Sequence, residues 1–184
     1  MLLPIYLYGQ GVLRKEAETV SADYPNLQKL VDDMFQTMEK ANGVGLAAPQ
    51  VGLSIRMFVV DGTCLAENYP ECEGFRRCMI NPELLEQNEE YDVKDEGCLS
   101  IPGIYESVKR PTWIKMRYLD QNLEEHVEEI TGFAARMTLH EYDHLDGTMF
   151  IDHVSTLRRQ LIKAKLGAIV KGKVSCDYKV KMVK

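Results

Sequence analysis

The chain has 184 residues, of which 45% are hydrophobic and 27% charged, and it carries a formal net charge of −6. This composition predicts one folded domain over residues 1–184 and excludes disordered, fibrous and repeat proteins. No stretch reaches the ~18 uncharged apolar residues of a membrane-spanning helix, and the apolar start lacks the basic region of a secretory signal, so we expect a soluble, cytoplasmic protein that binds neither membrane nor DNA.

An amphipathic helix is predicted near the start of the chain. Pro25 precedes it and Asn42-Gly43 ends it. Residues 1–8 are expected to form an extended segment that covers the core, and residues 55–60 a strand after the helix. The apolar residues of the helix recur at three- and four-residue steps: Leu27, Leu30, Val31, Met34, Phe35 and Met38.

The middle of the chain is predicted to be mainly β. Residues 62–77 contain Asn-Tyr-Pro and Glu-Gly and are interpreted as a long surface loop, a suitable place for an insertion. The runs that follow are rich in β-branched and aromatic residues and are separated by turn residues. They predict strands over residues 78–82, 84–93, 113–119 and 123–130.

Two further helices complete the prediction. The first spans residues 132–146, with Thr131 as its N-cap and Gly147 after its end. The second begins at Ser155, and the residues after Gly172 alternate like an edge strand. Its inner face is expected to carry Leu157, Leu161, Ile162, Leu166 and Ile169. The fold class is therefore α+β, with mainly antiparallel strands around a central helix, an N-terminal helix and a C-terminal helix.

The C-terminal helix and tail, from about residue 155, are strongly basic. Residues 158–184 contain nine lysines or arginines and a single acid, Asp177, whereas the rest of the chain is acidic. Such a split fits a docking tail for an anionic partner. The simpler alternative is a helix and strand whose charges are solvated.

The central helix contains a metal-binding pattern, His140-Glu141-Tyr142-Asp143-His144. Residues four apart project from the same face of a helix, so both imidazoles can reach one ion. Glu141 falls beside them, where it can handle a proton on water bound to that ion. The alternative is a surface helix whose two histidines happen to be four residues apart.

A third protein ligand is needed, and several candidates are open. The longer H-E-x-x-H-x-x-G-x-x-H pattern fails because Phe150 stands where its third histidine belongs, and no glutamate follows Glu141. Upstream, Cys98 offers a soft thiolate, and Gly97 lets its backbone approach a helix. The five cysteines are expected to be reduced, since their number is odd. The downstream candidates are Asp146, Asp152, His153, Cys176 and Asp177.

Three separated stretches together resemble the motifs of the peptide deformylases, in the same order. They are Gly-Val-Gly-Leu-Ala-Ala-Pro-Gln at residues 43–50, Glu-Gly-Cys-Leu-Ser at residues 96–100 and His-Glu-Tyr-Asp-His at residues 140–144. Residues 11–14, Gly-Val-Leu-Arg, are similar to the N-terminal pattern of that family. The resemblance covers most of residues 4–155.

This resemblance implies removal of the formyl group from the N-formylmethionine of new polypeptides, with release of formate. It assigns Glu141 as general base and acid, and Gln50 with the backbone N–H of Leu99 as donors to the developing oxyanion. The ion that it implies is Fe(II), with Zn(II) or another divalent ion as the alternative. Its ligands would be Cys98, His140 and His144.

Substrate contacts and a partner are expected as well. The extended backbone around Gly45 permits a peptide to add as a strand, and Val44 and Met137 are expected to line an apolar slot for methionine. The basic C-terminal region suggests docking on the ribosome, near the nascent peptide. Two other functions stay open: a binding module with a structural metal site, and an endopeptidase.

Overall fold

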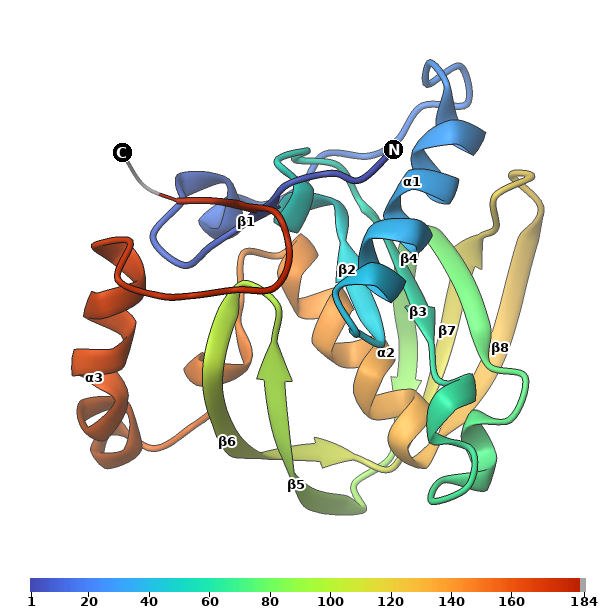
Figure 1. Cartoon of the computed structure of the whole chain (residues 1–184). Helices are drawn as coiled ribbons and strands as arrows, with labels where there is room; N and C mark the ends of the chain where they lie inside the picture. The colour runs from blue at the N-terminus through green and yellow to red at the C-terminus, as the bar shows by residue number, and fades with distance from the viewer. Residues whose placement is uncertain (183–184) are drawn as a thin grey trace.

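The computed structural model describes residues 1–182 (Figure 1), so Lys184, the last basic residue of the tail, lies outside the described residues. The helices of this part of the chain are α1 (Leu27–Lys40), α2 (Gly132–Leu145) and α3 (Thr156–Val170). Its strands are β1 (Ile5–Tyr6), β2 (Gly45–Ala47), β3 (Met57–Asp61), β4 (Arg76–Gln87), β5 (Tyr91–Cys98), β6 (Ile101–Pro111), β7 (Trp113–Leu119), β8 (Glu125–Thr131) and β9 (Val180–Lys181).

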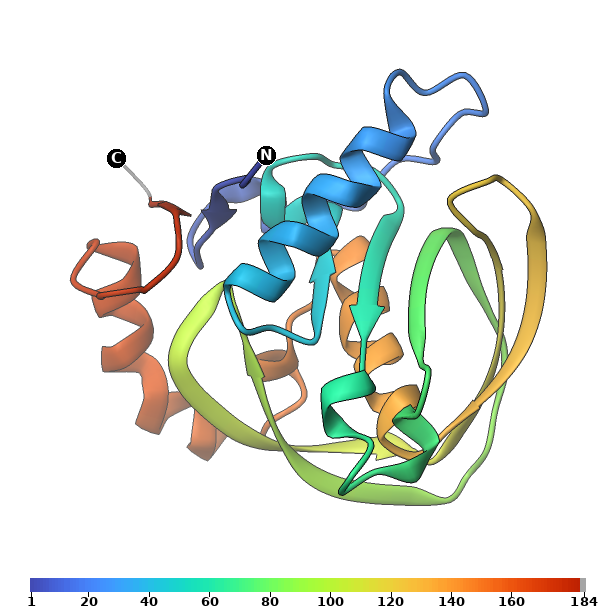
Figure 2. The same ribbon diagram turned by 45° about the vertical axis from the view of Figure 1, so that its right-hand side comes forward.

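The central helix α2 lies between two antiparallel β structures (Figures 1 and 2). One is a five-stranded sheet in the order β2-β3-β4-β7-β8, and the other is the long β5–β6 hairpin. Because side chains alternate across a strand, Phe58 and Val60 of β3 pack toward α2 while Met57 and Val59 pack toward α1. The predicted α+β class, with helices at both ends and one in the middle, is confirmed.

The helix predicted from apolar periodicity near the start of the chain and the helix predicted from its end signals around residues 132–146 both form where expected. In α1, Leu27, Val31, Met34 and Met38 are buried on one face. The helix α2 ends at Leu145, and Gly147 follows it with φ +71°. Within residues 1–182, none of the helices is both long and apolar enough to cross a lipid bilayer.

One strand prediction was wrong, and one strand was not predicted. The proposed strand over residues 84–93 is split by a turn, so that β4 ends at Gln87 and β5 begins at Tyr91. The strand β6 was missed altogether. Its inward side chains include the charged Glu106 and Arg110 along with Ile104 and Val108, so the alternation of apolar and polar residues that marks a half-buried strand is hidden.

Residues 62–77 are more than the surface loop that was predicted. They form two short 3-10 helices, and Cys72 and Phe75 are buried in the core beneath α2. Tyr69 stacks on Phe133 with ring centroids 4.4 Å apart. The Glu71 carboxylate accepts a hydrogen bond from the Phe133 N–H at 2.7 Å, whereas the Thr131 side chain makes no cap bond. This segment therefore caps α2 in place of Thr131.

The inner face of α3 is narrower than predicted. Ser155 caps the helix by accepting a hydrogen bond from the Arg158 N–H. Leu157 and Leu161 are 67% and 61% exposed, so only the row of Ile162, Leu166 and Ile169 packs on the core. The tail forms the short strand β9, which pairs in parallel with β1. The predicted alternating edge strand is thus only two residues long.

Candidate functional site

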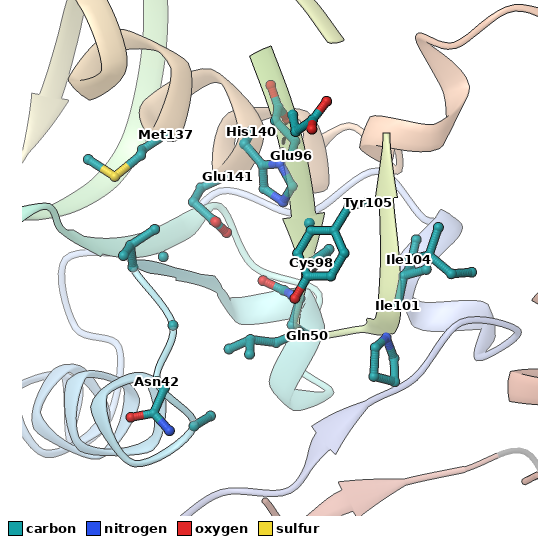
Figure 3. Close-up of a pocket in the computed structure, with 18 of the residues that line it drawn as sticks. Asn42, Gln50, Glu96, Cys98, Ile101, Ile104, Tyr105, Met137, His140 and Glu141 are labelled. Atoms are coloured by element: carbon teal, nitrogen blue, oxygen red, sulfur yellow. Dashed lines mark hydrogen bonds and ion pairs between the residues drawn. The ribbon is translucent and has the colours of Figure 1, made fainter. Parts of the chain in front are cut away.

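The two histidines of α2 and one cysteine of β5 converge on one site, and Figure 3 shows two of the three, Cys98 and His140, close to Glu141. The ligand atoms of Cys98, His140 and His144 all lie within 4.8 Å of one another. The Cys98 Sγ atom lies 3.4 Å from His144 Nε2. A tetrahedral ion with a sulfur bond of about 2.3 Å and a nitrogen bond of about 2.0 Å separates two such atoms by about 3.5 Å. The donor set therefore fits a single divalent ion.

An irregularity in the pairing of β5 with β6 lies just before the cysteine. Between the pairs Glu96–Glu106 and Cys98–Ile101, β5 has one residue, Gly97, whereas β6 has four, residues 102–105. The extra residues of this bulge therefore belong to β6, and a bulge bends its strand and increases the local twist. The Tyr105 ring of the bulged stretch lies over Gly97, since a Cβ there would be 2.6 Å from the ring. The sulfur of Cys98 faces the helix α2, with Sγ 3.4 Å from His144 Nε2.

Glu96 orients His140 from behind. Its Oε1 atom accepts a hydrogen bond from His140 Nδ1 at 2.8 Å, which leaves Nε2 of that ring for an ion. Arg110 and Arg136 also donate to the Glu96 carboxylate. Burial raises the pKa of Glu96, but the hydrogen bonds from Arg110 and His140 outweigh burial and hold this pKa far below its usual value. Sequence reasoning missed all three supporting residues. Glu96 is part of the Glu-Gly-Cys-Leu-Ser stretch at residues 96–100, and this was the available signal for it, although no role was assigned to it.

The pKa values of the two histidines are shifted in opposite directions. Burial lowers the pKa of His140, but its hydrogen bonds with Cys98 and Glu96 outweigh burial, so that this pKa is raised. For His144, burial and the neighbouring His140 lower the pKa to about 3. A metal ion binds imidazole only through an unprotonated nitrogen, so metal binding at this site releases a proton.

Glu141 is buried beside this cluster. Burial raises its pKa to about 7, and its Oε2 atom has no hydrogen-bond partner within residues 1–182. Unpartnered buried carboxylate oxygens are rare because desolvation is costly, and they call for an explanation such as a bound water, an ion or a catalytic role. A Cβ at Gly45 would lie 2.3 Å from Glu141 Oε1, so the carboxylate occupies space that only glycine leaves free.

Gln50 approaches the cluster from the turn after β2. Its Oε1 atom accepts a hydrogen bond from the Ala47 N–H at 2.8 Å, which fixes the orientation of the amide. Its Nε2 atom consequently points toward Cys98 Sγ at 3.3 Å and Ser100 Oγ at 3.1 Å. The buried amide N–H of Gln50 therefore lies close to the Cys-His-His ligand set, as does the Glu141 carboxylate.

A cavity of about 460 Å³ opens onto this space. Gln50, His140 and Glu141 form its polar end, while Val44 and Met137 belong to its apolar wall. Gly45, Leu99 and Cys98 also line it, so eight of the nine predicted site residues border one cavity. The ninth, His144, does not line the cavity but belongs to the same ligand group as Cys98 and His140. Phe133 and Tyr105 line the cavity as well and were not predicted.

Most of the downstream residues considered as a third ligand are engaged elsewhere. Asp146 pairs with Arg56, Asp152 with Arg14, and His153 with Asp143. Cys176 packs against the core beneath α3. Within residues 1–182, the only other group of three candidate ligands consists of Asp120, Glu124 and His126, of which the last two are exposed.

Comparison with known proteins gives one consistent result. A family model described as polypeptide deformylase matches residues 2–160. Proteins named peptide deformylase from Christiangramia forsetii and Cytophaga hutchinsonii are 46% and 43% identical, over 98% of this chain and 96% and 97% of theirs. Crystal structures of peptide deformylases from Thermotoga maritima and Ehrlichia chaffeensis, the latter in complex with actinonin, match with TM-scores of 0.76 and 0.84 at 41% and 35% identity. They cover 84% and 95% of this chain and 99% of each neighbour.

Proposed function

Because the chain belongs to the polypeptide deformylase family, we propose that the cavity beside α2 is its active site. The family removes the N-formyl group from nascent peptides, so the protein is a metal-dependent hydrolase of protein biosynthesis that acts on N-formylmethionine and releases formate. The observation that supports the cavity as the active site is the buried, unpartnered carboxylate oxygen of Glu141 next to the Cys-His-His ligand set.

We assign Cys98, His140 and His144 as the ligands of one divalent ion. Three protein ligands leave one position open, which is typical of catalytic rather than structural sites. When bound there, a divalent ion would lower the pKa of a coordinated water molecule to about 7 and would polarise a carbonyl oxygen. The hydrogen bond from His140 to Glu96 keeps the ring in the tautomer that a ligand needs.

Glu141 transfers the proton, and Gln50 stabilises the negative charge that develops on the formyl oxygen. Glu141 accepts a proton from the attacking water and delivers it to the departing amine nitrogen. A pKa of about 7 suits both directions of transfer near neutral pH. Gln50 Nε2 and the Leu99 N–H donate hydrogen bonds to the formyl oxygen as it gains negative charge, and each such donor is worth roughly 3 kcal/mol in the transition state.

The substrate peptide is proposed to lie along β2. This strand is at the edge of the five-stranded sheet, so a peptide can pair with its backbone as an added strand. Val44, Met137 and Phe133 form the apolar wall that would receive the methionine side chain. Gly45 carries no side chain that would separate the peptide from Glu141.

Formate release tests this function directly. The substrates are a short N-formylmethionyl peptide and its N-acetyl counterpart, each given to metal-loaded protein. The expected result is rapid release from the formyl peptide alone, since the cavity must admit the small acyl group between Glu141 and Gln50. Cleavage of a blocked internal peptide bond instead would favour the endopeptidase alternative.

We propose Fe(II) as the native ion. Thiolate and imidazole ligands accept both Fe(II) and Zn(II), so the donor set alone does not choose between them. Oxygen would oxidise ferrous iron or Cys98. Protein prepared without oxygen is therefore expected to contain iron and to lose activity on exposure to air. Equal activity under both conditions, with zinc bound, would overturn the assignment.

We also propose that residues 1–184 form one catalytic domain, with α3 and the tail as part of it. A cluster of buried apolar residues supports this, because it joins Ile162, Leu166 and Ile169 of α3 to Leu7 and to Val108 of β6. The C-terminal region is thus packed on the same core that supports the site.

The exposed basic residues of the C-terminal region are proposed to dock the protein on the ribosome. Arg158 is already paired with Glu106, but Lys163, Lys165, Lys171 and Lys173 are exposed and, within the described residues, make no ion pair. Replacing these four lysines with glutamine is expected to weaken co-sedimentation with ribosomes, and the wild-type binding is expected to weaken with added salt. Unchanged co-sedimentation would contradict this proposal.

A further inference from the structure

The turn that carries Leu99 is held by both ends of the chain. Leu99 and Ser100 form the tip of the β5–β6 hairpin, between the paired residues Cys98 and Ile101. The Tyr178 hydroxyl donates a hydrogen bond to the Leu99 carbonyl oxygen at 2.7 Å. The Tyr8 N–H donates to the Ser100 carbonyl oxygen at 2.8 Å. Two successive carbonyl groups of this turn are therefore bonded to segments outside the hairpin.

The two outside segments are themselves tied together. The Ile5 N–H donates to the Lys179 carbonyl oxygen at 2.8 Å and the Leu7 N–H to the Lys181 carbonyl oxygen at 3.0 Å, which makes β1 and β9 a two-stranded parallel sheet. This sheet lies beside the tip of the hairpin (Figure 1). The Tyr178 side chain packs against the same core cluster as the Leu99 side chain. The Tyr178 hydroxyl therefore belongs to a segment that is itself held in place by the β1–β9 pairing and by core packing.

Movement of this turn would disturb both proposed oxyanion donors. One donor is the N–H of Leu99 itself. The other, Gln50 Nε2, is hydrogen-bonded to Ser100 Oγ at 3.1 Å, so its position also depends on the turn. The peptide between Leu99 and Ser100 is the central peptide of the turn, and this is the peptide whose orientation differs between type I and type II turns.

We propose that Tyr178 is a positioning residue for the deformylation reaction. Its hydroxyl holds the central peptide of the turn, so that the Leu99 N–H and Gln50 Nε2 meet the formyl oxygen together. This inference rests on the proposed function of the cavity and extends it to a tail residue outside the stretch that the family model matches, residues 2–160. A displacement of about 1 Å at reacting groups costs up to about 100-fold in rate.

Tyr178→Phe removes the hydroxyl and keeps the ring. In the full-length, metal-loaded enzyme, kcat is expected to fall by about tenfold, because the donors act mainly in the transition state. KM for the formyl peptide and the melting temperature are expected to stay near the wild-type values. The matched control is Tyr24→Phe, since Tyr24 packs against the same core cluster and its hydroxyl has no hydrogen-bond partner within residues 1–182.

Amide hydrogen exchange gives a readout that does not depend on activity. Exchange in a peptide covering residues 97–104 is expected to be faster in Tyr178→Phe, with α1 unchanged. An unchanged kcat would overturn the inference, as would a lower melting temperature without a change in kcat, or a rise in KM alone. If wild-type protein releases no formate, the proposed function fails. Amide hydrogen exchange in Tyr178→Phe then decides separately whether Tyr178 holds the turn. An unchanged exchange rate in residues 97–104 would show that it does not.

Discussion

Replacing Glu141 with glutamine is expected to lower kcat for formate release by about 10³-fold, within the range of general acid–base catalysis. Glutamine keeps the size of the side chain but can neither accept the proton from water nor deliver it to the amine nitrogen. The folded state should not suffer, because Glu141 is buried and one carboxylate oxygen has no partner within residues 1–182. A neutral amide is easier to bury than a carboxylate.

The measurement combines kcat, bound metal and melting temperature for Glu141→Gln. A matched control is Glu83→Gln, because Glu83 is an exposed acid paired with Arg117 far from the cavity, and it should leave all three values unchanged. Loss of kcat with full metal content and an unchanged or higher melting temperature supports the catalytic role. Retention of activity within tenfold would instead favour a metal site that only stabilises the fold.

The second large effect is expected for Cys98→Ala, which should abolish both metal retention and formate release. The substitution removes the only thiolate of the ligand set and leaves two imidazoles. Ligand donors must be deprotonated to bind, so the affinity of the wild-type site should also fall as the pH is lowered. Metal content after dialysis, measured beside activity, tests the assignment.

Cys64→Ala is the control for this experiment, since Cys64 is an exposed thiol outside the cavity. It should retain one ion per chain and full activity. Stoichiometric metal in Cys98→Ala would show that another residue completes the site. His153 would then be the first to examine, because it contacts Asp143 on α2, next to His144.

Part of the candidate site was predictable from local signals, whereas Gln50 and Leu99 were expected only from the resemblance of the motifs to a known family. His140 and His144 share a helix face as a consequence of their spacing, and the amphipathic pattern of α1 identified its buried residues. The strand β7 was likewise predicted with its observed bounds, since its residues alternate between buried and half-buried positions. In each case the interactions that decide the structure are between residues close in the sequence.

The strand β6 and residues 62–77 were not predictable in this way. The inward-facing Glu106 pairs with Arg158 of α3, and the inward-facing Arg110 pairs with Glu96. Their burial thus depends on partners 52 and 14 residues away. Similarly, Glu71 caps α2 from a segment whose composition is typical of a loop. Local patterns cannot show that a charged residue will find its partner across the fold.

By itself, the sequence determined the donor atoms of this protein: a soft thiolate, two imidazoles one helical turn apart and an acid beside them. The resemblance of the motifs implied Cys98 as the third ligand, but only the tertiary structure brings it to His144, through the position of the β5–β6 hairpin beside α2. The tertiary structure also brings the Tyr178 hydroxyl into hydrogen-bond contact with the Leu99 carbonyl oxygen, 79 residues away in the sequence. The physical reason is that periodicity and capping act within a few residues, whereas strand register and core packing fix contacts between distant segments.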